Sequence, residues 1–297
     1  MHIVYVTDGK AGHRSQALGL YQAMQRVSAK ELTFQEIDAA SLSRFNLFLA
    51  RGQQQHPLIQ QKPDYILSVG SATQLKGLLL GQVFPQAKTV VLMKPKFPLQ
   101  WFDYVVVPKH DGLAQEDNIL VTQGALNPMI NEKRHQKKRI LIALGGSSKR
   151  HQWQDEKVLQ AIKSIVSNNP KSEIILTTSR RTPKVFLAQL THQSFADKLT
   201  IFPVEETPQG WIFEQMQQAE AVWVTEDSVS MIYEALTAGC KVGVIEIERL
   251  KQDRITQSVD ELLDKGWISR STQLSALGLP KPLKEADRVA TYLLNPS

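Results

Sequence analysis

The sequence predicts an α/β protein of two domains, each built around a doubly wound parallel sheet. Two observations lead to this prediction. Short apolar strands alternate with amphipathic helices along most of the 297 residues. The alternation stops once, at a polar and basic stretch near the middle of the chain, and then resumes. A chain of this length can form two domains with a core each.

The first half opens with a strand, a glycine-containing loop and a helix that we expect from about Ser15 to Ser28. The loop lacks the G-x-G-x-x-G spacing of a Rossmann fingerprint, and it is not a P-loop. It instead carries Asp8, Lys10 and His13 beside the flexible Gly9. Further strands are expected at 32–37, 63–69, 89–93 and 104–107, with a helix at 70–80.

Residues 132–139 are polar and strongly basic, and they predict an interdomain linker. The N-terminal domain then comprises residues 1–131 and the C-terminal domain residues 140–280. Residues 281–297 predict a final helix that packs back on the N-terminal domain.

The second half repeats the pattern of strand, loop and helix. A strand from Arg139 leads into the loop Gly145–Ser148, and a helix follows at 155–167. The next strand, 173–177, is followed by Arg180 and Arg181. A short strand at 200–204, which contains Phe202, and a helix at 211–219 come next.

Residues 222–245 form the most informative stretch. An apolar strand at 222–224 ends at Asp227 and Ser228, whose side chains favour helix N-caps. A helix then runs to Gly239, and a strand follows. This places the positive end of a helix at the carboxyl edge of a parallel sheet, where anions bind. Glu234 lies six residues after Ser228, where it could accept hydrogen bonds from a pair of sugar hydroxyls.

In open α/β sheets ligands bind at the carboxyl ends of the strands, and the loops there are rich in Gly, Ser and charge in both halves. Each group also has a simpler interpretation: a tight turn for Gly145–Ser148, a solvated pair for the two arginines, and a surface glutamate for Glu234. The residues predicted to bind the nucleotide part of a ligand are Gly145, Gly146, Ser147, Ser148, Arg180, Arg181, Phe202, Ser228, Val229, Ser230 and Glu234.

The composition restricts the partners and the compartment. The 35 basic and 29 acidic residues give a net charge of +6, which suits phosphorylated ligands or peripheral contact with an anionic membrane. No motif for nucleic-acid binding is present, so we expect no nucleic-acid partner. The single Cys240 excludes an intrachain disulfide, and the first residues lack the features of a signal peptide. We expect a cytoplasmic protein, which could lie peripherally on the inner face of the cell membrane.

Five motifs carry a family resemblance. Their residues are 7–13, 106–111, 144–148, 178–183 and 225–231. Together and in this order they resemble the mitochondrial fission ELM1-like family over nearly the whole chain. The plant founding member of that family is linked to recruiting the fission machinery, whereas bacterial relatives are described as glycosyltransferases of the GT-B fold. The resemblance therefore implies two Rossmann-like domains that face each other across a cleft.

More distantly, the chain is similar to MurG-type glycosyltransferases. In that group a glycine-rich loop ending in histidine opens the N-terminal domain, and Gly9 to His13 match it in part. A Gly-Gly-Ser loop opens the C-terminal domain, and a loop and helix with a glutamate six residues on hold the diphosphate and the ribose. The similarity implies a uridine nucleotide, although the loop at Thr225 is more acidic than the pattern and lacks its glycine.

A glycosyltransferase needs a base for the acceptor hydroxyl, and His13 at a helix N-terminus is the first candidate. Asp8 is the rival base, although Asp8-Gly9 also suits an Asx turn, and His13 could simply cap or pack. His110 and Asp111 form a second candidate pair at another strand end. The sequence has no Asp-x-Asp and no Cys/His cluster, so we expect no metal site and no resident cofactor, the nucleotide-sugar being a substrate.

The sequence thus favours a metal-independent glycosyltransferase that moves a hexosyl or N-acetylhexosaminyl group from a nucleotide-sugar to a cell-envelope glycan or a lipid-linked acceptor. Two alternatives remain open. The chain could be a non-catalytic, ELM1-like adaptor that keeps the fold. It could also be an epimerase that uses the same nucleotide pocket.

Overall fold

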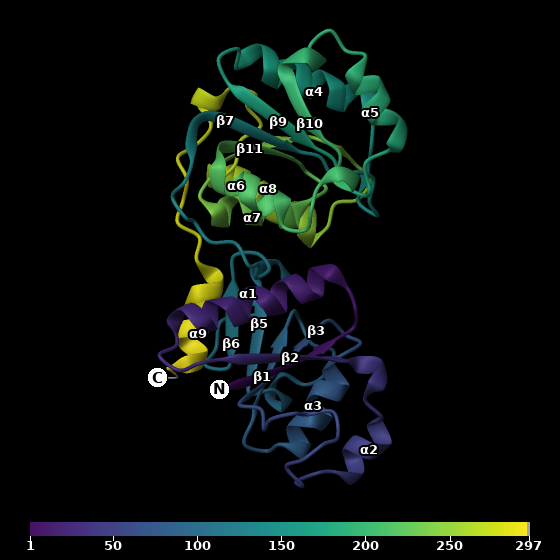
Figure 1. The fold of residues 1–297 in the computed structure, drawn as a ribbon, viewed down its shortest axis with the longest axis vertical. Helices are drawn as coiled ribbons and strands as arrows, with labels where there is room; N and C mark the ends of the chain where they lie inside the picture. The colour runs from purple at the N-terminus through teal and green to yellow at the C-terminus, as the bar shows by residue number, and fades with distance from the viewer. Residues whose placement is uncertain (296–297) are drawn as a thin grey trace. The chain divides into compact units, whose positions relative to one another are not determined.

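The structure, a computed structural model, describes residues 1–295. It divides into two compact units (Figure 1). The N-terminal unit comprises Met1–Pro128 and residues 284–295, and the C-terminal unit comprises Met129–Leu283. The first boundary thus lies three residues before the one predicted, and the last helix belongs to the N-terminal unit. The last two residues of the predicted segment 281–297 lie outside the described residues.

The N-terminal unit is built on six parallel strands in the order β2-β1-β3-β4-β5-β6. The order reverses between β1 and β3, so the carboxyl ends of these two strands flank the point where ligands bind in such sheets. The strands are β1 (His2–Thr7), β2 (Thr33–Asp38), β3 (Tyr65–Val69), β4 (Lys88–Leu92), β5 (Tyr104–Pro108) and β6 (Ile119–Thr122).

Helices cover both faces of this sheet (Figure 1). On one face α1 (Ala11–Val27) packs beside α9 (Glu285–Leu294), and Arg26 pairs with Asp287. On the other face lie α2 (Arg44–Leu49) and α3 (Gln74–Val83). The burial of α9 against α1 explains why the chain returns to this unit.

The C-terminal unit has five parallel strands in the order β10-β9-β7-β11-β12, with the reversal between β7 and β11. One face is covered by α6, α7 and α8, and the other by α4 and α5. A short antiparallel pair, β8 with β13, lies outside this sheet. The strands are β7 (Gln136–Ala143), β8 (His151–Gln152), β9 (Glu173–Thr177), β10 (Leu199–Phe202), β11 (Ala219–Thr225), β12 (Lys241–Ile245) and β13 (Glu248–Arg249). The helices are α4 (Asp155–Asn168), α5 (Lys184–Thr191), α6 (Trp211–Gln218), α7 (Val229–Ala238) and α8 (Arg254–Asp264).

The predicted linker at 132–139 is wrong from Gln136 onward, because β7 begins there and pairs with β11. The side chains of the first three residues of β7 are exposed. The strand therefore begins before its apolar residues, and its first residues show no apolar pattern in the sequence. The sequence interpretation also missed α2, α5, α8 and β6. Within residues 1–295, no helix has the length and apolar character that crossing a bilayer requires.

Candidate active site

Asp8 and His13 lie together at the reversal point of the N-terminal sheet. Asp8 follows β1, and His13 is the third residue of α1, which begins four residues earlier than predicted. The Nδ1 atom of His13 lies 2.9 Å from Oδ1 of Asp8 and 3.1 Å from Oδ2. An ionised carboxylate only accepts hydrogen bonds, so Nδ1 carries the hydrogen and donates the hydrogen bond to Asp8.

Gly70 gives the imidazole its place. Val6 pairs with Ser68 across β1 and β3, so two residues further on Asp8 lies opposite Gly70. A Cβ atom on Gly70 would come within 2.2 Å of Cε1 of His13. Gly70 also has a φ of +77°, in the region that glycine favours. The ring of His13 therefore lies directly against the backbone at this position.

The charge of Asp8 is held by its neighbours. Burial raises the pKa of this carboxyl, but hydrogen bonds from His13 and Lys10 outweigh that effect and lower it below its ordinary value. The carboxylate thus fixes the tautomer of His13. Nε2 of His13 has no hydrogen-bonding partner among residues 1–295, and it is the atom that could take a proton from a substrate.

The second candidate pair, His110 and Asp111, lies elsewhere on the same sheet. Both follow β5, in the 3₁₀ turn Lys109–Asp111. Three strand spacings separate β1 from β5, which amounts to about 14 Å. Asp111 is buried, and its carboxylate accepts the backbone amide of Lys94 at 3.1 Å. Asp111 therefore holds the loop after β4.

In the C-terminal unit the register of β7 and β11 brings two loops together. Ala143 pairs with Val224, so the glycines after β7 lie opposite the acidic residues after β11. The amide of Gly145 donates to Oγ1 of Thr225 at 2.6 Å, and the amide of Gly146 donates to Oδ2 of Asp227 at 3.0 Å. Both amides thus bond protein atoms, which corrects the expectation that they face a ligand.

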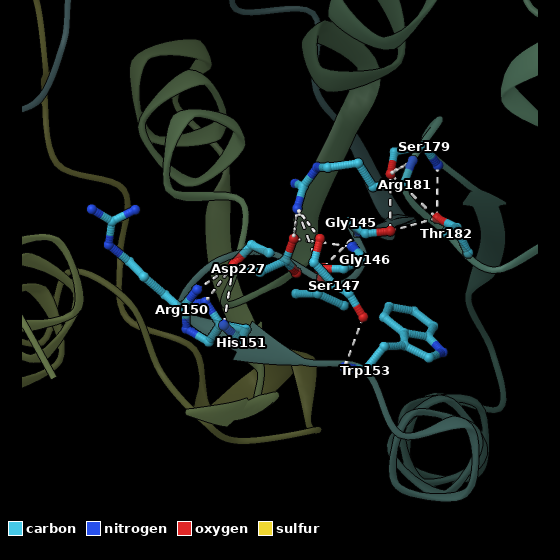
Figure 2. A network of polar contacts seen from close by, with 12 residues as sticks. Gly145, Gly146, Ser147, Arg150, His151, Trp153, Ser179, Arg181, Thr182 and Asp227 are labelled. Carbon is cyan, nitrogen blue, oxygen red and sulfur yellow. Dashed lines mark hydrogen bonds and ion pairs between the residues drawn. The ribbon is translucent and has the colours of Figure 1, made fainter. Parts of the chain in front are cut away.

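The side chain of Asp227 lies between these two loops, where it contacts Gly146 and Arg181 (Figure 2). Its carboxylate side chain is fully buried, and Oδ2 also lies 2.7 Å from Nη1 of Arg181. Gly145 must be glycine here, because a Cβ would come within 2.3 Å of Oδ2 of Asp227. The second oxygen, Oδ1, is buried without a hydrogen-bonding partner among the described residues.

The side chain of Asp227 does not cap α7, contrary to the sequence interpretation. Ser228 occupies the N-cap position, and no side chain accepts a hydrogen bond from the first turn there. The predicted capping is wrong because Asp227 turns toward Gly146 and Arg181 instead. Within residues 1–295, the amides of Val229, Ser230 and Met231 therefore have no acceptor.

The serines of the first loop shape its turns. Oγ of Ser147 accepts the amide of Trp153 at 3.2 Å, and Oγ of Ser148 accepts the amides of Arg150 and His151 at 3.1 Å each. The amide of Ser148 bonds the carbonyl of His151 at 2.9 Å. The amide of Ser147 is the one amide between 145 and 148 with no acceptor among the described residues.

The two arginines after β9 have different roles. Arg181 contacts the carbonyl oxygens of Gly146 and Ser147 as well as Asp227, so it braces the first loop. Arg180 is exposed, and within residues 1–295 it has no ion pair or hydrogen bond through its side chain. Of the two arginines, Arg180 is thus the one whose guanidinium is not engaged by a described residue.

Glu234 lies partly buried on α7 and has no hydrogen bond or ion pair with any described residue. Burial raises the pKa of this carboxyl to about 7. Phe202 lies at the end of β10, where its ring packs on Trp211 with 4.9 Å between the ring centroids. The Phe202 ring is thus held by packing. Its side chain stays partly exposed at the carboxyl edge of the C-terminal sheet.

The family model described as Mitochondrial fission ELM1 matches residues 11–296. The chain belongs to this family. A curated relative, the uncharacterized protein RP120 of Rickettsia prowazekii (strain Madrid E), is 22% identical over 347 residues, covering 99% of this chain and 98% of the relative.

Solved structures show the fold. MurG of Acinetobacter baumannii is 15% identical with a TM-score of 0.52, over 99% of this chain and 90% of MurG. MnaA of S. aureus, solved with UDP, is 12% identical with a TM-score of 0.54, over 99% and 88%. The UDP-GlcNAc 2-epimerase of Methanocaldococcus jannaschii is 12% identical with a TM-score of 0.54, over 99% of both chains. The expected GT-B fold class of this ELM1-family chain is confirmed.

Two features of the site had no signal that we recognised in the sequence. The sequence predicts that Asp227 caps the helix, and only the strand register shows that it faces Gly146. Glu226 is buried beside Arg249, which also binds Asp260 at 2.7 Å. Arg249 therefore links the loop after β11 to α8 through its two ion pairs. These three residues are far apart in sequence.

Proposed function

We propose that this ELM1-family protein is a metal-independent glycosyltransferase. It moves a hexosyl or N-acetylhexosaminyl group from a nucleoside-diphosphate sugar to a cell-envelope glycan or a lipid-linked acceptor. The nucleotide-sugar is a substrate, and no resident cofactor takes part. The protein acts in the cytoplasm, peripherally at an anionic membrane.

The observation that carries this proposal is the arrangement of α7. Three amides without a protein acceptor, at Val229 to Met231, stand at its N-terminus, where the helix dipole favours an anion. Glu234 stands about 7 Å further along the same helix, from the rise of 1.5 Å per residue. The amides suit a diphosphate, and the unpartnered carboxyl suits the hydroxyls of a ribose. Arg180 supplies a guanidinium for the phosphate oxygens.

The uridine nucleotide is favoured by comparison. MnaA was solved as a complex with UDP, and the M. jannaschii enzyme is a UDP-GlcNAc 2-epimerase. Both proteins share the fold of this chain at low identity. On that basis we propose that the nucleotide of the donor is a uridine nucleotide.

In the proposed reaction the acceptor hydroxyl gives its proton to Nε2 of His13. The bond from the anomeric carbon to the phosphate oxygen breaks, and a bond from the same carbon to the acceptor oxygen forms. The nucleoside diphosphate leaves with the bonding electron pair, and the amides at the start of α7 stabilise its added charge. Asp8 keeps His13 in the required tautomer and stabilises the imidazolium.

The proposal is tested first by thermal shift with UDP, GDP and CMP. We expect UDP to raise the melting temperature of the wild type and to have a smaller effect on Glu234→Gln. Asp8→Asn, in the other unit, is the matched control and should keep the full shift. No shift with any nucleotide would refute the proposal and favour the adaptor.

A second assay separates the two enzyme classes. Incubation with UDP-N-acetylglucosamine and membrane extract should release UDP and transfer labelled sugar to the extract, and His13→Ala should abolish the transfer. An isomerised nucleotide-sugar with no transfer would identify an epimerase instead.

A further inference from the structure

Helix α2 presents its apolar side chains to solvent. Phe45 is 69% exposed, Phe48 59% and Leu49 58%. Their spacing of three and four residues places them on one side of the helix. Leu47 is fully buried on the other side, where it anchors the helix in the core. Figure 1 shows α2 at the margin of the N-terminal unit, beside α3.

The helix needs no partner to form. Oγ of Ser43 accepts the amide of Asn46 at the first turn, and the amide of Ala50 bonds the carbonyl of Asn46 at the last. With Leu47 in the core, the exposed side is held in place by the rest of the unit. Exposed apolar side chains are therefore a property of the folded protein and not of a loose segment.

The surroundings of this helix are basic. Residues 39–63 contain no Asp or Glu but contain Arg44, Arg51 and Lys62, all of them exposed. Neither Arg44 nor Arg51 forms an ion pair with a carboxylate among the described residues. Elsewhere the basic side chains are often paired, as Arg26 is with Asp287 and Arg139 with Glu173. The apolar face is thus flanked by two arginines without an ion pair among the described residues, and the exposed Asp38 and Asp64 border this range.

Single exposed apolar residues are common on soluble proteins, and Val185, Leu250 and Leu279 are examples here. Helix α2 differs because three apolar side chains, two of them aromatic, lie on one side of it between two arginines that form no ion pair with a described residue. This pattern is typical of helices that lie in a membrane interface. We propose that the α2 face, formed by Arg44, Phe45, Phe48, Leu49 and Arg51, binds an anionic lipid bilayer by inserting its apolar side chains below the headgroups. This binding does not require that the protein transfers a sugar.

Co-sedimentation with vesicles tests the proposal on the full chain. We expect the wild type to bind vesicles of phosphatidylcholine and phosphatidylglycerol at least about tenfold more tightly than vesicles of phosphatidylcholine alone, because two arginines act near the surface. The double variant Phe45→Ser/Phe48→Ser and the double variant Arg44→Gln/Arg51→Gln should each lose about tenfold or more. Leu279→Ser, which removes a side chain that is 75% exposed, is the matched control and should bind as the wild type does.

Depth of insertion is measured separately. Cys240 is buried, so a cysteine introduced by Phe48→Cys can be labelled selectively with an environment-sensitive dye. Anionic vesicles should shift its emission to the blue, whereas a label at Leu279→Cys should stay unchanged. Retained binding by both double variants, or no blue shift at position 48, would overturn the proposal.

The competing occupants have their own signatures. A second copy of the chain on this face would appear in sedimentation velocity as a dimer that Phe45→Ser/Phe48→Ser dissociates, and that result would overturn the lipid proposal. If the wild type stays in the supernatant with anionic vesicles, that result also overturns the lipid proposal. It would favour a protein partner for this face. Because these measurements contain no nucleotide, their failure leaves the proposed transferase activity untouched.

Discussion

Nδ1 of His13 lies 2.9 Å from Oδ1 of Asp8, so the two residues that the sequence offers as rival bases form one pair. The pair depends on the sheet order, since β1 and β3 are neighbours and Gly70 after β3 leaves room for the ring. In the proposed reaction Asp8 orients His13, and His13 takes the proton of the substrate. The orienting role of Asp8 and the proton-accepting role of His13 can be tested on each residue separately.

Asp8→Asn should lower turnover strongly without changing nucleotide binding. The amide can no longer fix the tautomer or stabilise the imidazolium, so we expect kcat to fall by about 10² to 10⁴. The thermal shift with UDP should stay at the wild-type value, because the proposed nucleotide residues belong to the other unit. Lys10→Gln, which removes the salt bridge to Asp8 but keeps the carboxylate, should lose only a few-fold. Turnover by Asp8→Asn within twofold of the wild type would show that the pair is structural.

Gly70→Ala should damage activity through the position of His13. Its Cβ would meet Cε1 of His13 at 2.2 Å, so the ring must move away from Asp8. We expect at least about a tenfold loss of kcat and a free energy of unfolding lower by about 1 to 3 kcal/mol, the latter partly from the positive φ.

Gly112→Ala provides the control for this variant. Gly112 has a φ of +71°, and a Cβ there would meet nothing within 4 Å. It should show the loss of stability, measured by chemical denaturation, without the loss of kcat. Equal kcat losses in the two variants would show that backbone strain, and not displacement of His13, causes the effect.

The sequence predicts the fold of this chain better than it predicts the site. Strands such as β3 and β9 are apolar runs bounded by turn residues, and α4 begins at the predicted Asp155. Prediction fails where local composition misleads: β7 begins in a basic stretch, and the exposed apolar side of α2 breaks the usual helix pattern.

Strand pairing decides the site, and a single sequence does not show pairing. The glycines at 145 and 146 mark a place where another group comes close, but that group is Asp227 from β11. Likewise Arg180 and Arg181 are equivalent in the sequence, whereas in the structure only Arg181 pairs with Asp227. Contacts between loops that follow different strands therefore had to come from the structure.

Asp227→Asn should strengthen nucleotide binding. The buried carboxylate places a negative charge beside the proposed phosphate position and occupies Arg181. With asparagine the charge is gone, the amide oxygen can still accept the amide of Gly146, and Arg181 is free for the ligand. We expect the Kd for UDP to fall by about tenfold, measured by isothermal titration. In Asp227→Asn/Arg181→Gln most of this gain should vanish, and unchanged or weaker binding by the single variant would contradict the argument.

Glu234→Gln should stabilise the protein at high pH and weaken nucleotide binding. The folded-state pKa is raised from 4.5 to about 7, so between these values the folded protein holds a proton that the unfolded chain has lost. Stability of the wild type therefore falls as the pH rises from about 4.5 to about 7 and changes no further above that.

Glutamine has no such dependence, so the free energy of unfolding of Glu234→Gln should exceed that of the wild type by about 1 to 3 kcal/mol at pH 8, with little difference at pH 5. The Kd for UDP should rise about tenfold at pH 8, where the wild type presents a charged acceptor to the ribose. Glu205→Gln, an exposed glutamate with no partner among residues 1–295, is the control for the change of charge and should alter neither quantity. A gain in stability that is equal at pH 5 and pH 8 would show that burial of the charged form of Glu234 is not its cause.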